Sequence, residues 1–152
     1  MNKKSVSPIN SIGKLKIFAV STLNELELPL VSKGISAGFP SPATDFLDDT
    51  IDLNKYLIKN PSSTFIAFVS GVSMADAGIA DKDILIIDKS IEPADGKIAV
   101  CIIDSEFVLK RLKVNNEGIW LMPANKNFKE TLINEYNDFE IWGIVTHSIQ
   151  KH

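Results

Sequence analysis

Ser73 and Lys110 are the two residues of this sequence whose types and positions could together do chemistry. Ser73 lies in the small polar turn Ser70-Gly71-Val72-Ser73-Met74, directly after the apolar run 65–69, a pattern typical of a strand that ends at an exposed hydroxyl. A serine hydroxyl is a weak nucleophile at neutral pH unless a neighbouring base removes its proton. The sequence therefore predicts nucleophilic catalysis by Ser73, with a base that the fold brings beside it.

Strand parity favours Lys110 as that base. In the run 106–114 alternate side chains share a face, which places Lys110 with the apolar residues Val108, Leu112 and Val114. Apolar surroundings disfavour the ammonium form. Lowering a lysine pKa from about 10.4 to about 7.5 requires roughly 4 kcal/mol of destabilisation of that form by desolvation and by the electrostatic field of the protein. Lys113 falls on the opposite face, which also carries apolar residues. Parity thus prefers Lys110 without deciding between the two lysines.

The motif Ser-Gly-x-Ser-Met, followed by a strand that ends in Lys-Arg-Leu, resembles the LexA/UmuD family of self-cleaving Ser-Lys proteases, and within it the UmuD type most. Four further stretches match in the same order and with similar spacing: 38–43, 51–54, 78–83 and 139–145. The resemblance covers residues 35–152 and implies that Ser73 is the nucleophile and Lys110 the general base. We expect Gly71 and Met74 to shape the turn and support the oxyanion.

A cleavage site is expected ahead of this domain. Residues 34–40 combine small residues with Pro40 and are followed closely by Pro42, a composition that resists helix and favours an extended, accessible segment. A plain Gly/Pro hinge is the alternative interpretation. The resemblance implies that the bond between Ala37 and Gly38 is cut, because small side chains let the backbone approach the nucleophile. Residues 1–37 would then be a removable N-terminal arm and residues 38–152 a protease-like β domain.

The remaining pattern predicts a mainly β protein. Strand-like runs occupy 65–69, 84–88, 97–103, 106–114, 118–122 and 139–149, with a two-residue turn at Asp104-Ser105 and a shorter run at 15–20 in the arm. One short amphipathic helix is expected within 51–60, with Asp52 as its N-cap and Asn60-Pro61 as its stop. Short turns between successive strands indicate a curled antiparallel sheet, of the kind shared by LexA and signal peptidases, with one short helix and an N-terminal arm.

Composition limits the classes of function. A chain of 152 residues with 45% hydrophobic content suits one folded domain. Its 16 basic and 19 acidic residues give a net charge of −3, which disfavours direct sequence-specific DNA binding. The single cysteine, Cys101, lies in an apolar run and is expected to be a buried thiol in a reducing cytoplasm. No segment reaches the length of a membrane span, so a cytoplasmic location is expected.

The sequence gives little support for other catalytic, metal-binding or nucleotide-binding sites. His147 shares strand parity with Val145 and Ile149, which predicts a packed histidine, and His152 is the last residue. Two histidines and one cysteine give no metal-ligand spacing, and the glycines form no nucleotide-binding motif, so no metal and no cofactor is expected. Trp120 and Trp142 fall in strand patterns and are expected in the core or at an interface.

The resemblance implies an SOS mutagenesis protein. Its partners would be a second copy in a homodimer, a RecA filament on single-stranded DNA that stimulates cleavage, and a UmuC-type Y-family polymerase that the shortened form joins for translesion synthesis. A LexA-like repressor core, a signal peptidase and a non-enzymatic polymerase-binding platform are the alternatives. The sequence departs from the family at Val72, where an acidic residue is frequent, and in the length of its arm.

Overall fold

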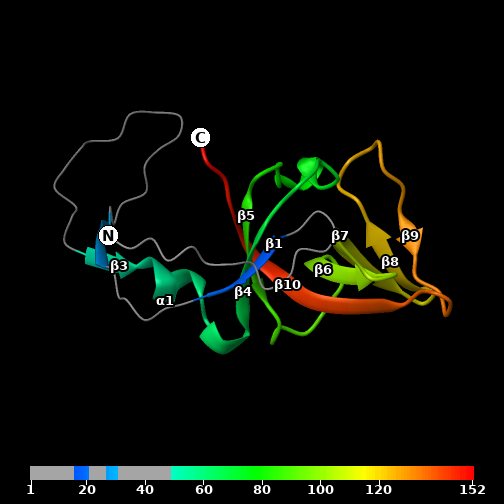
Figure 1. The fold of residues 1–152 in the computed structure, drawn as a ribbon, viewed down its shortest axis with the longest axis horizontal. Helices are drawn as coiled ribbons and strands as arrows, with labels where there is room; N and C mark the ends of the chain where they lie inside the picture. The colour runs from blue at the N-terminus through cyan, green and yellow to red at the C-terminus, as the bar shows by residue number, and fades with distance from the viewer. Residues whose placement is uncertain (1–15, 21–26, 31–48) are drawn as a thin grey trace. The chain divides into compact units, whose positions relative to one another are not determined.

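The computed structural model describes residues 16–20, 27–30 and 49–152 (Figure 1). The chain forms two compact units, one made of Met1–Val20 with Ser62–His152 and the other of Ser21–Pro61. Ser73 and Lys110 both belong to the larger unit. Everything that positions these two side chains relative to each other is therefore contained in one compact body.

The smaller unit contains a strand pair and a short helix. Strand β2 (Glu27–Leu30) pairs antiparallel with β3 (Asp49–Asp52), and helix α1 (Leu53–Leu57) follows directly. The carboxylate of Asp52 caps the helix by accepting from the amide of Asn54 at 2.9 Å, which confirms the predicted N-cap. The predicted helix 51–60 is too long, because its first two residues belong to β3 and Ile58 is already extended, at φ −111° and ψ 102°.

The larger unit is built on one antiparallel sheet, which has eight strands within the described residues, in the order β1-β4-β5-β10-β6-β7-β8-β9 (Figure 1). Its strands are β1 (Lys16–Ala19), β4 (Thr64–Phe68), β5 (Ile84–Asp88), β6 (Ile98–Ile103), β7 (Glu106–Asn115), β8 (Gly118–Met122), β9 (Thr131–Leu132) and β10 (Phe139–Ile149). Two 3-10 turns, η1 (Pro61–Ser63) and η2 (Ala75–Ala77), interrupt the chain between strands. The mainly β, antiparallel fold class is confirmed.

Local sequence signals account for most of these strands. The predicted runs agree with β4 to β8 and β10 to within one residue at each end. The turn at Asp104-Ser105 is confirmed: both residues have positive φ, 49° and 68°, as a tight two-residue hairpin requires, and Ile103 pairs with Glu106 across it. The small strands β2, β3 and β9 were not predicted, since each spans four residues or fewer and has little alternation to read.

Part of the expected arm is built into the sheet. Strand β1 corresponds to the run at 15–20 and pairs antiparallel with β4, where Ile17 lies opposite Ala67. Ile17 is only 1% exposed. Burying an aliphatic side chain of this size stabilises a fold by about 1.5–3 kcal/mol, so β1 contributes to the core of the larger unit.

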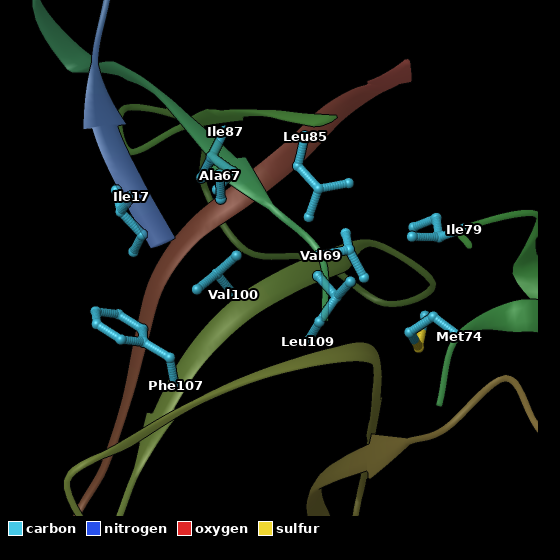
Figure 2. Close-up of a cluster of buried hydrophobic side chains, with 10 residues drawn as sticks. All are labelled: Ile17, Ala67, Val69, Met74, Ile79, Leu85, Ile87, Val100, Phe107 and Leu109. Atoms are coloured by element: carbon cyan, nitrogen blue, oxygen red, sulfur yellow. The ribbon is translucent and has the colours of Figure 1, made fainter. Parts of the chain in front are cut away.

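Two hydrophobic clusters fill the larger unit, and β7 contributes to both. Phe107 and Leu109 pack in the first cluster, whereas Leu112 and Val108 pack in the second. Figure 2 shows the first cluster, in which side chains from β1, β4, β5, β6 and β7 meet three residues of the β4–β5 connection, Val69, Met74 and Ile79. Neighbouring side chains of β7 therefore point to different clusters, as strand alternation predicts.

Two irregularities in β10 correct the parity prediction for His147. The register shifts between Ile141 and Gly143 and again between Val145 and His147. Val145 lies opposite Ile87 and His147 opposite Ile86, so the two side chains point to opposite faces, and the prediction that they share a face is wrong. The extra residue of a bulge reverses the alternation beyond it, which a pattern of period two cannot reveal.

Candidate active site

The turn that carries Ser73 is a long excursion between two neighbouring strands. After β4 the chain leaves the sheet at Val69, and two backbone bonds of 2.9 Å close the base of the excursion: the amide of Val69 donates to the carbonyl of Asp83, and the amide of Lys82 donates to the carbonyl of Val69. The intervening residues are thus held at both ends by the sheet. Within them, hydrophobic anchors and side-chain hydrogen bonds determine the shape.

Met74 and Ile79 anchor the excursion in the core. They are 2% and 3% exposed and pack in the first cluster (Figure 2). Between them η2 forms a single tight turn, which ends at Gly78 with φ 77°. Because Met74 directly follows Ser73, burial of its side chain fixes the chain on one side of the proposed nucleophile.

Gly71 and Asp81 fix the chain on the other side. Gly71 has φ 108°, a conformation that glycine adopts without strain and other residues adopt at a cost. Its amide donates to Oδ1 of Asp81 at 2.8 Å, while Oδ2 of Asp83, a buried carboxylate, accepts from the amide of Ala80, also at 2.8 Å. Two carboxylates therefore hold the backbone on either side of the turn.

Lys110 lies in a regular part of the sheet. It pairs with Ala99 across β6 and β7, is partly buried, and alternates with Val108 and Leu112 of the second cluster. Its Nζ lies 5.8 Å from the centroid of the Phe128 ring. Backbone pairing along β7 fixes the position of its Cα without help from a particular side chain.

Ser73 and Lys110 line the same pocket. Its volume is about 200 Å³, and its walls come from the turn at Val69 to Met74, from β7 between Glu106 and Lys110, and from Phe128. Gly71 and Met74 also line it. Lys113 is not among the lining residues and lies on Trp120 instead, with Nζ 5.9 Å from the ring centroid. The structure thus brings together four residues singled out from the sequence, and of the two candidate lysines it brings Lys110 to the serine.

The expected scissile bond lies outside the described residues. Neither Ala37 nor Gly38 belongs to the described ranges, and the same holds for the expected boundary between the arm and the β domain. The cleavage site therefore remains a prediction from the sequence.

Comparison with known proteins identifies the family. The family model Peptidase S24-like matches residues 29–146, a range that includes both Ser73 and Lys110. The chain belongs to this peptidase family. The LexA/UmuD resemblance is thereby confirmed, and relatives from both branches are found.

Protein MucA of Salmonella typhimurium is 40% identical to this member of the peptidase family over 141 residues, which cover 91% of this chain and 96% of MucA. Protein ImpA of the same species is 38% identical over 123 residues, covering 81% of this chain and 83% of its own. The LexA repressor of Clostridium novyi is 34% identical over 110 residues, 72% of this chain but only 53% of the repressor. The similarity to MucA and ImpA thus covers more than four-fifths of each chain, whereas that to the repressor covers about half of the repressor.

Residues that the sequence did not single out complete the site of this peptidase family member. Asp81 and Asp83 lie in a stretch that matched the family without a stated role, whereas Asn125 and Phe128 carried no signal at all. Asn125 donates from Nδ2 to the carbonyl of Val72 at 2.8 Å, and Phe128 forms one wall of the pocket. Their partners are distant in sequence, so only the fold reveals them.

Cys101 lies in the second cluster, on the strand that pairs with β7. It is fully buried and opposite Val108, which confirms the expected core thiol. Burial raises the pKa of the Cys101 thiol from 9.0 to about 12, against the opposing influence of the positive charge on Lys110. The face of the sheet that carries Lys110 therefore disfavours a thiolate strongly.

Other sites are not assembled in the part of the chain that the structure describes. Over residues 16–20, 27–30 and 49–152 there is no group of three or more His, Cys, Asp or Glu side chains that could hold a metal ion. His147 contacts the hydroxyl of Thr146 through Nδ1 at 3.0 Å. Trp142 packs on Phe65 and Phe107 at ring-centroid distances of 5.1 and 5.7 Å, as expected for a core aromatic. Within the same ranges, no helix is long and apolar enough to cross a membrane.

Proposed function

We propose that this protein is a self-cleaving peptidase of the SOS mutagenesis type, which cuts its own chain between Ala37 and Gly38 with Ser73 as nucleophile and Lys110 as general base. The single observation that carries the proposal is the pocket of about 200 Å³ lined by both residues in a member of a peptidase family. A serine and a lysine are sufficient for acyl transfer, so no metal or cofactor is invoked.

The reaction proceeds by proton transfer and acyl transfer. Neutral Lys110 accepts the proton of the Ser73 hydroxyl as Oγ attacks the carbonyl carbon of Ala37. The tetrahedral intermediate collapses, the bond to the nitrogen of Gly38 breaks, and the ammonium of Lys110 returns the proton to the departing amine. Water then hydrolyses the ester between Ser73 and Ala37, and Lys110 again acts as the base.

The protonation state of Lys110 sets the rate. Partial burial beside Val108 and Leu112 favours the neutral amine. The Phe128 ring at 5.8 Å favours the ammonium form by about 0.5–1 kcal/mol, which is small beside the roughly 4 kcal/mol needed to bring a lysine pKa near neutrality. Cleavage without any stimulating partner should therefore accelerate as the pH approaches the pKa of a free lysine.

The oxyanion requires hydrogen-bond donors, and the amide of Ser73 is the natural one. The positive φ of Gly71 and the buried side chain of Met74 support this role, because they fix the chain on both sides of that amide. The substrate segment belongs to the same chain or to a second copy, which supplies a high effective concentration and lets a slow catalyst act on one target.

The biological setting follows from the relatives. Similarity over more than four-fifths of MucA and of ImpA supports a homodimer that cleaves itself on a RecA filament, in the cytoplasm. Its shortened form would serve a Y-family translesion polymerase of the UmuC type. The competing function is a non-enzymatic platform that binds the polymerase, in which Ser73 and Lys110 would catalyse no cleavage.

Self-cleavage at alkaline pH tests the proposal. The purified full chain is incubated at about pH 10, near the pKa of a free lysine, and its products are weighed by mass spectrometry. The wild type should release a fragment that begins at Gly38, and Ser73→Ala and Lys110→Ala should stay intact. Ser70→Ala and Lys113→Ala are matched controls: Ser70 lines the same pocket and Lys113 lies on the same strand, and both should cleave like the wild type.

The outcomes separate the two functions. A wild type that stays intact at alkaline pH and also with RecA filaments would leave the platform as the better account. Cleavage that persists in Lys110→Ala but disappears in Lys113→Ala would assign the base to the other face of β7.

A further inference from the structure

The connection after β8 touches the turn of Ser73 and the side of the pocket that carries Lys110. The carbonyl of Ala124 accepts from the amide of Asp76 at 2.7 Å, and Nδ2 of Asn125 donates to the carbonyl of Val72 at 2.8 Å. Three residues later Phe128 lines the pocket and lies 5.8 Å from Nζ of Lys110. Asp76 and Val72 bracket Ser73 in sequence, so this connection holds the turn from outside at two points.

The orientation of the Asn125 amide is determined by its two partners. Its Oδ1 accepts from the amide of Asn127 at 2.9 Å, and its Nδ2 donates to the carbonyl of Val72. With the amide flipped, Nδ2 would face the N–H of Asn127 and Oδ1 would face the carbonyl of Val72, and neither contact could be a hydrogen bond. Asn125 therefore links its own loop to the turn of Ser73 through two hydrogen bonds.

The carbonyl that Asn125 holds belongs to the same peptide unit as the amide of Ser73. A peptide unit is planar, and in the trans form its C=O and N–H bonds point in opposite directions. No cis peptide bond occurs among the described residues. Holding the carbonyl of Val72 toward Asn125 consequently directs the N–H of Ser73 to the other side of that unit.

We infer that Asn125 is a positioning residue for catalysis, which orients the Ser73 amide as oxyanion donor through its bond to the Val72 carbonyl. The inference rests on the proposed self-cleavage. It assigns to the connection after β8 a task distinct from those of Ser73 and Lys110, since Asn125 acts only through Val72.

The fold does not depend on this bond. The carbonyl of Val72 also accepts from the amide of Ala75 at 3.2 Å, and the Asp76–Ala124 bond keeps the connection in place. Removing the Nδ2 donor thus leaves no buried carbonyl without a partner, and its cost in stability should be small. What it removes is the constraint on the direction of one peptide plane.

Two substitutions isolate the donor. Asn125→Ser and Asn125→Asp both retain an oxygen that can accept from the amide of Asn127, as serine and aspartate do in such turns. The ionised carboxylate of aspartate has no proton to donate to Val72, and serine lacks Nδ2 and carries its hydroxyl one bond closer to the backbone. Asn115 offers the matched control, because its Oδ1 accepts from the amide of Glu117 at 2.9 Å in the same way, in the β7–β8 turn away from the pocket. Asn115→Ser and Asn115→Asp therefore reproduce the chemical change without the proposed consequence.

The experiment measures the first-order rate of self-cleavage of the full chain between pH 8 and 10.5, together with the thermal midpoint of each variant. Misdirecting one oxyanion donor should slow Asn125→Ser about tenfold, and Asn125→Asp more, because its carboxylate faces the Val72 carbonyl. The rate of Asn125→Ser should fall by the same factor at every pH, since the titration of Lys110 is untouched. Thermal midpoints should stay within about 2 °C of the wild type.

Each result bears on the inference. A rate for Asn125→Ser within twofold of the wild type would overturn it, and so would an equal slowing of Asn115→Ser or a loss of rate that merely follows a lowered thermal midpoint. These outcomes leave the proposed function standing, because the wild type still cleaves and Ser73→Ala does not. A wild type as inert as Ser73→Ala contradicts the proposed function itself and removes the inference with it.

Discussion

The turn that carries Ser73 and the strand that carries Lys110 are held by different kinds of bond. Around Ser73, side chains hold the backbone: Asp81 binds the amide of Gly71, and Asn125 binds the carbonyl of Val72. Along β7, backbone pairing with β6 sets the position of Lys110, and pairing with β8 begins at the next residue. The position of Ser73 thus depends on the identity of several neighbours, whereas that of Lys110 depends on the sheet as a whole.

This difference suggests where the site can be changed. Substitutions around the Ser73 turn should affect cleavage more than stability, because the turn is anchored in the core by Met74 and Ile79 while its fine geometry relies on side-chain bonds. Substitutions along the sheet should affect stability or its pH dependence first. Three pairs of variants test that contrast.

The largest effect is expected for Gly71→Ala. At φ 108° an alanine strains the backbone by about 1–3 kcal/mol, and relief of that strain would move the turn next to Ser73. Self-cleavage should fall at least a hundredfold, as for loss of an oxyanion donor. The rate is measured at alkaline pH, and stability by urea unfolding.

Gly118→Ala is the control for that strain. Gly118, the first residue of β8, has φ 131°, and a Cβ there would meet only Cδ1 of Leu132 within 4 Å, at 3.7 Å. The two variants should lose similar stability, yet only Gly71→Ala should lose cleavage. Equal cleavage by both variants would contradict the view that cleavage depends on the exact backbone geometry of the Ser73 turn.

The same contrast explains what the sequence could predict. The strands and the face of Lys110 follow from alternation, which is a local signal that survives wherever pairing is regular. The bulge of β10 between Val145 and His147 breaks this rule and makes the prediction that these two residues share a face wrong. Sequence reasoning therefore recovered the sheet and the face of β7 on which Lys110 lies.

The supports of Ser73 could not be predicted in that way. Asp81 and Asn125 lie 10 and 53 positions from the residues that they hold, and no spacing rule links an aspartate or an asparagine to a distant backbone group. The resemblance pointed to Ser73 and Lys110, but the hydrogen bonds around Ser73 depend on the path of two loops. Their residues have no periodicity, so only the folded chain brings them together.

The second-largest effect is expected in the sheet, where Cys101 of β6 should make stability depend on pH. Its folded-state pKa of about 12 exceeds the ordinary value of 9.0, so the folded protein holds the thiol proton more tightly than the unfolded chain does. The stabilisation from this group is complete below pH 9 and is lost as the pH rises from about 9 to about 12. At pH 10 the loss amounts to about 1.4 kcal/mol.

Urea unfolding of the cleavage-inactive Ser73→Ala chain at pH 8 and pH 10, with and without Cys101→Ala, measures this loss. Alanine at 101 lowers stability at both pH values through the missing sulfur, but it should remove the part of the pH dependence that belongs to the thiol. If stability falls by the same amount between pH 8 and pH 10 in both proteins, the thiol does not contribute to this pH dependence. The comparison also defines the pH range in which alkaline self-cleavage reports on a folded protein.

The smallest effect is expected for Asp81→Ala, and it isolates one support of the Ser73 turn. The bond from the Gly71 amide to Asp81 is 2.8 Å long and exposed, so its loss should lower stability by only about 0.5–1 kcal/mol, because water replaces the carboxylate. Asp95→Ala removes an equivalent exposed bond of 2.8 Å from the amide of Val114, on the strand of Lys110. Equal changes in urea midpoint with a several-fold slower cleavage in Asp81→Ala alone would show that the turn of the nucleophile relies on individual side chains. Equal slowing in both variants would instead mean that strand and turn depend on their exposed carboxylates to the same degree, and the contrast between them would not hold.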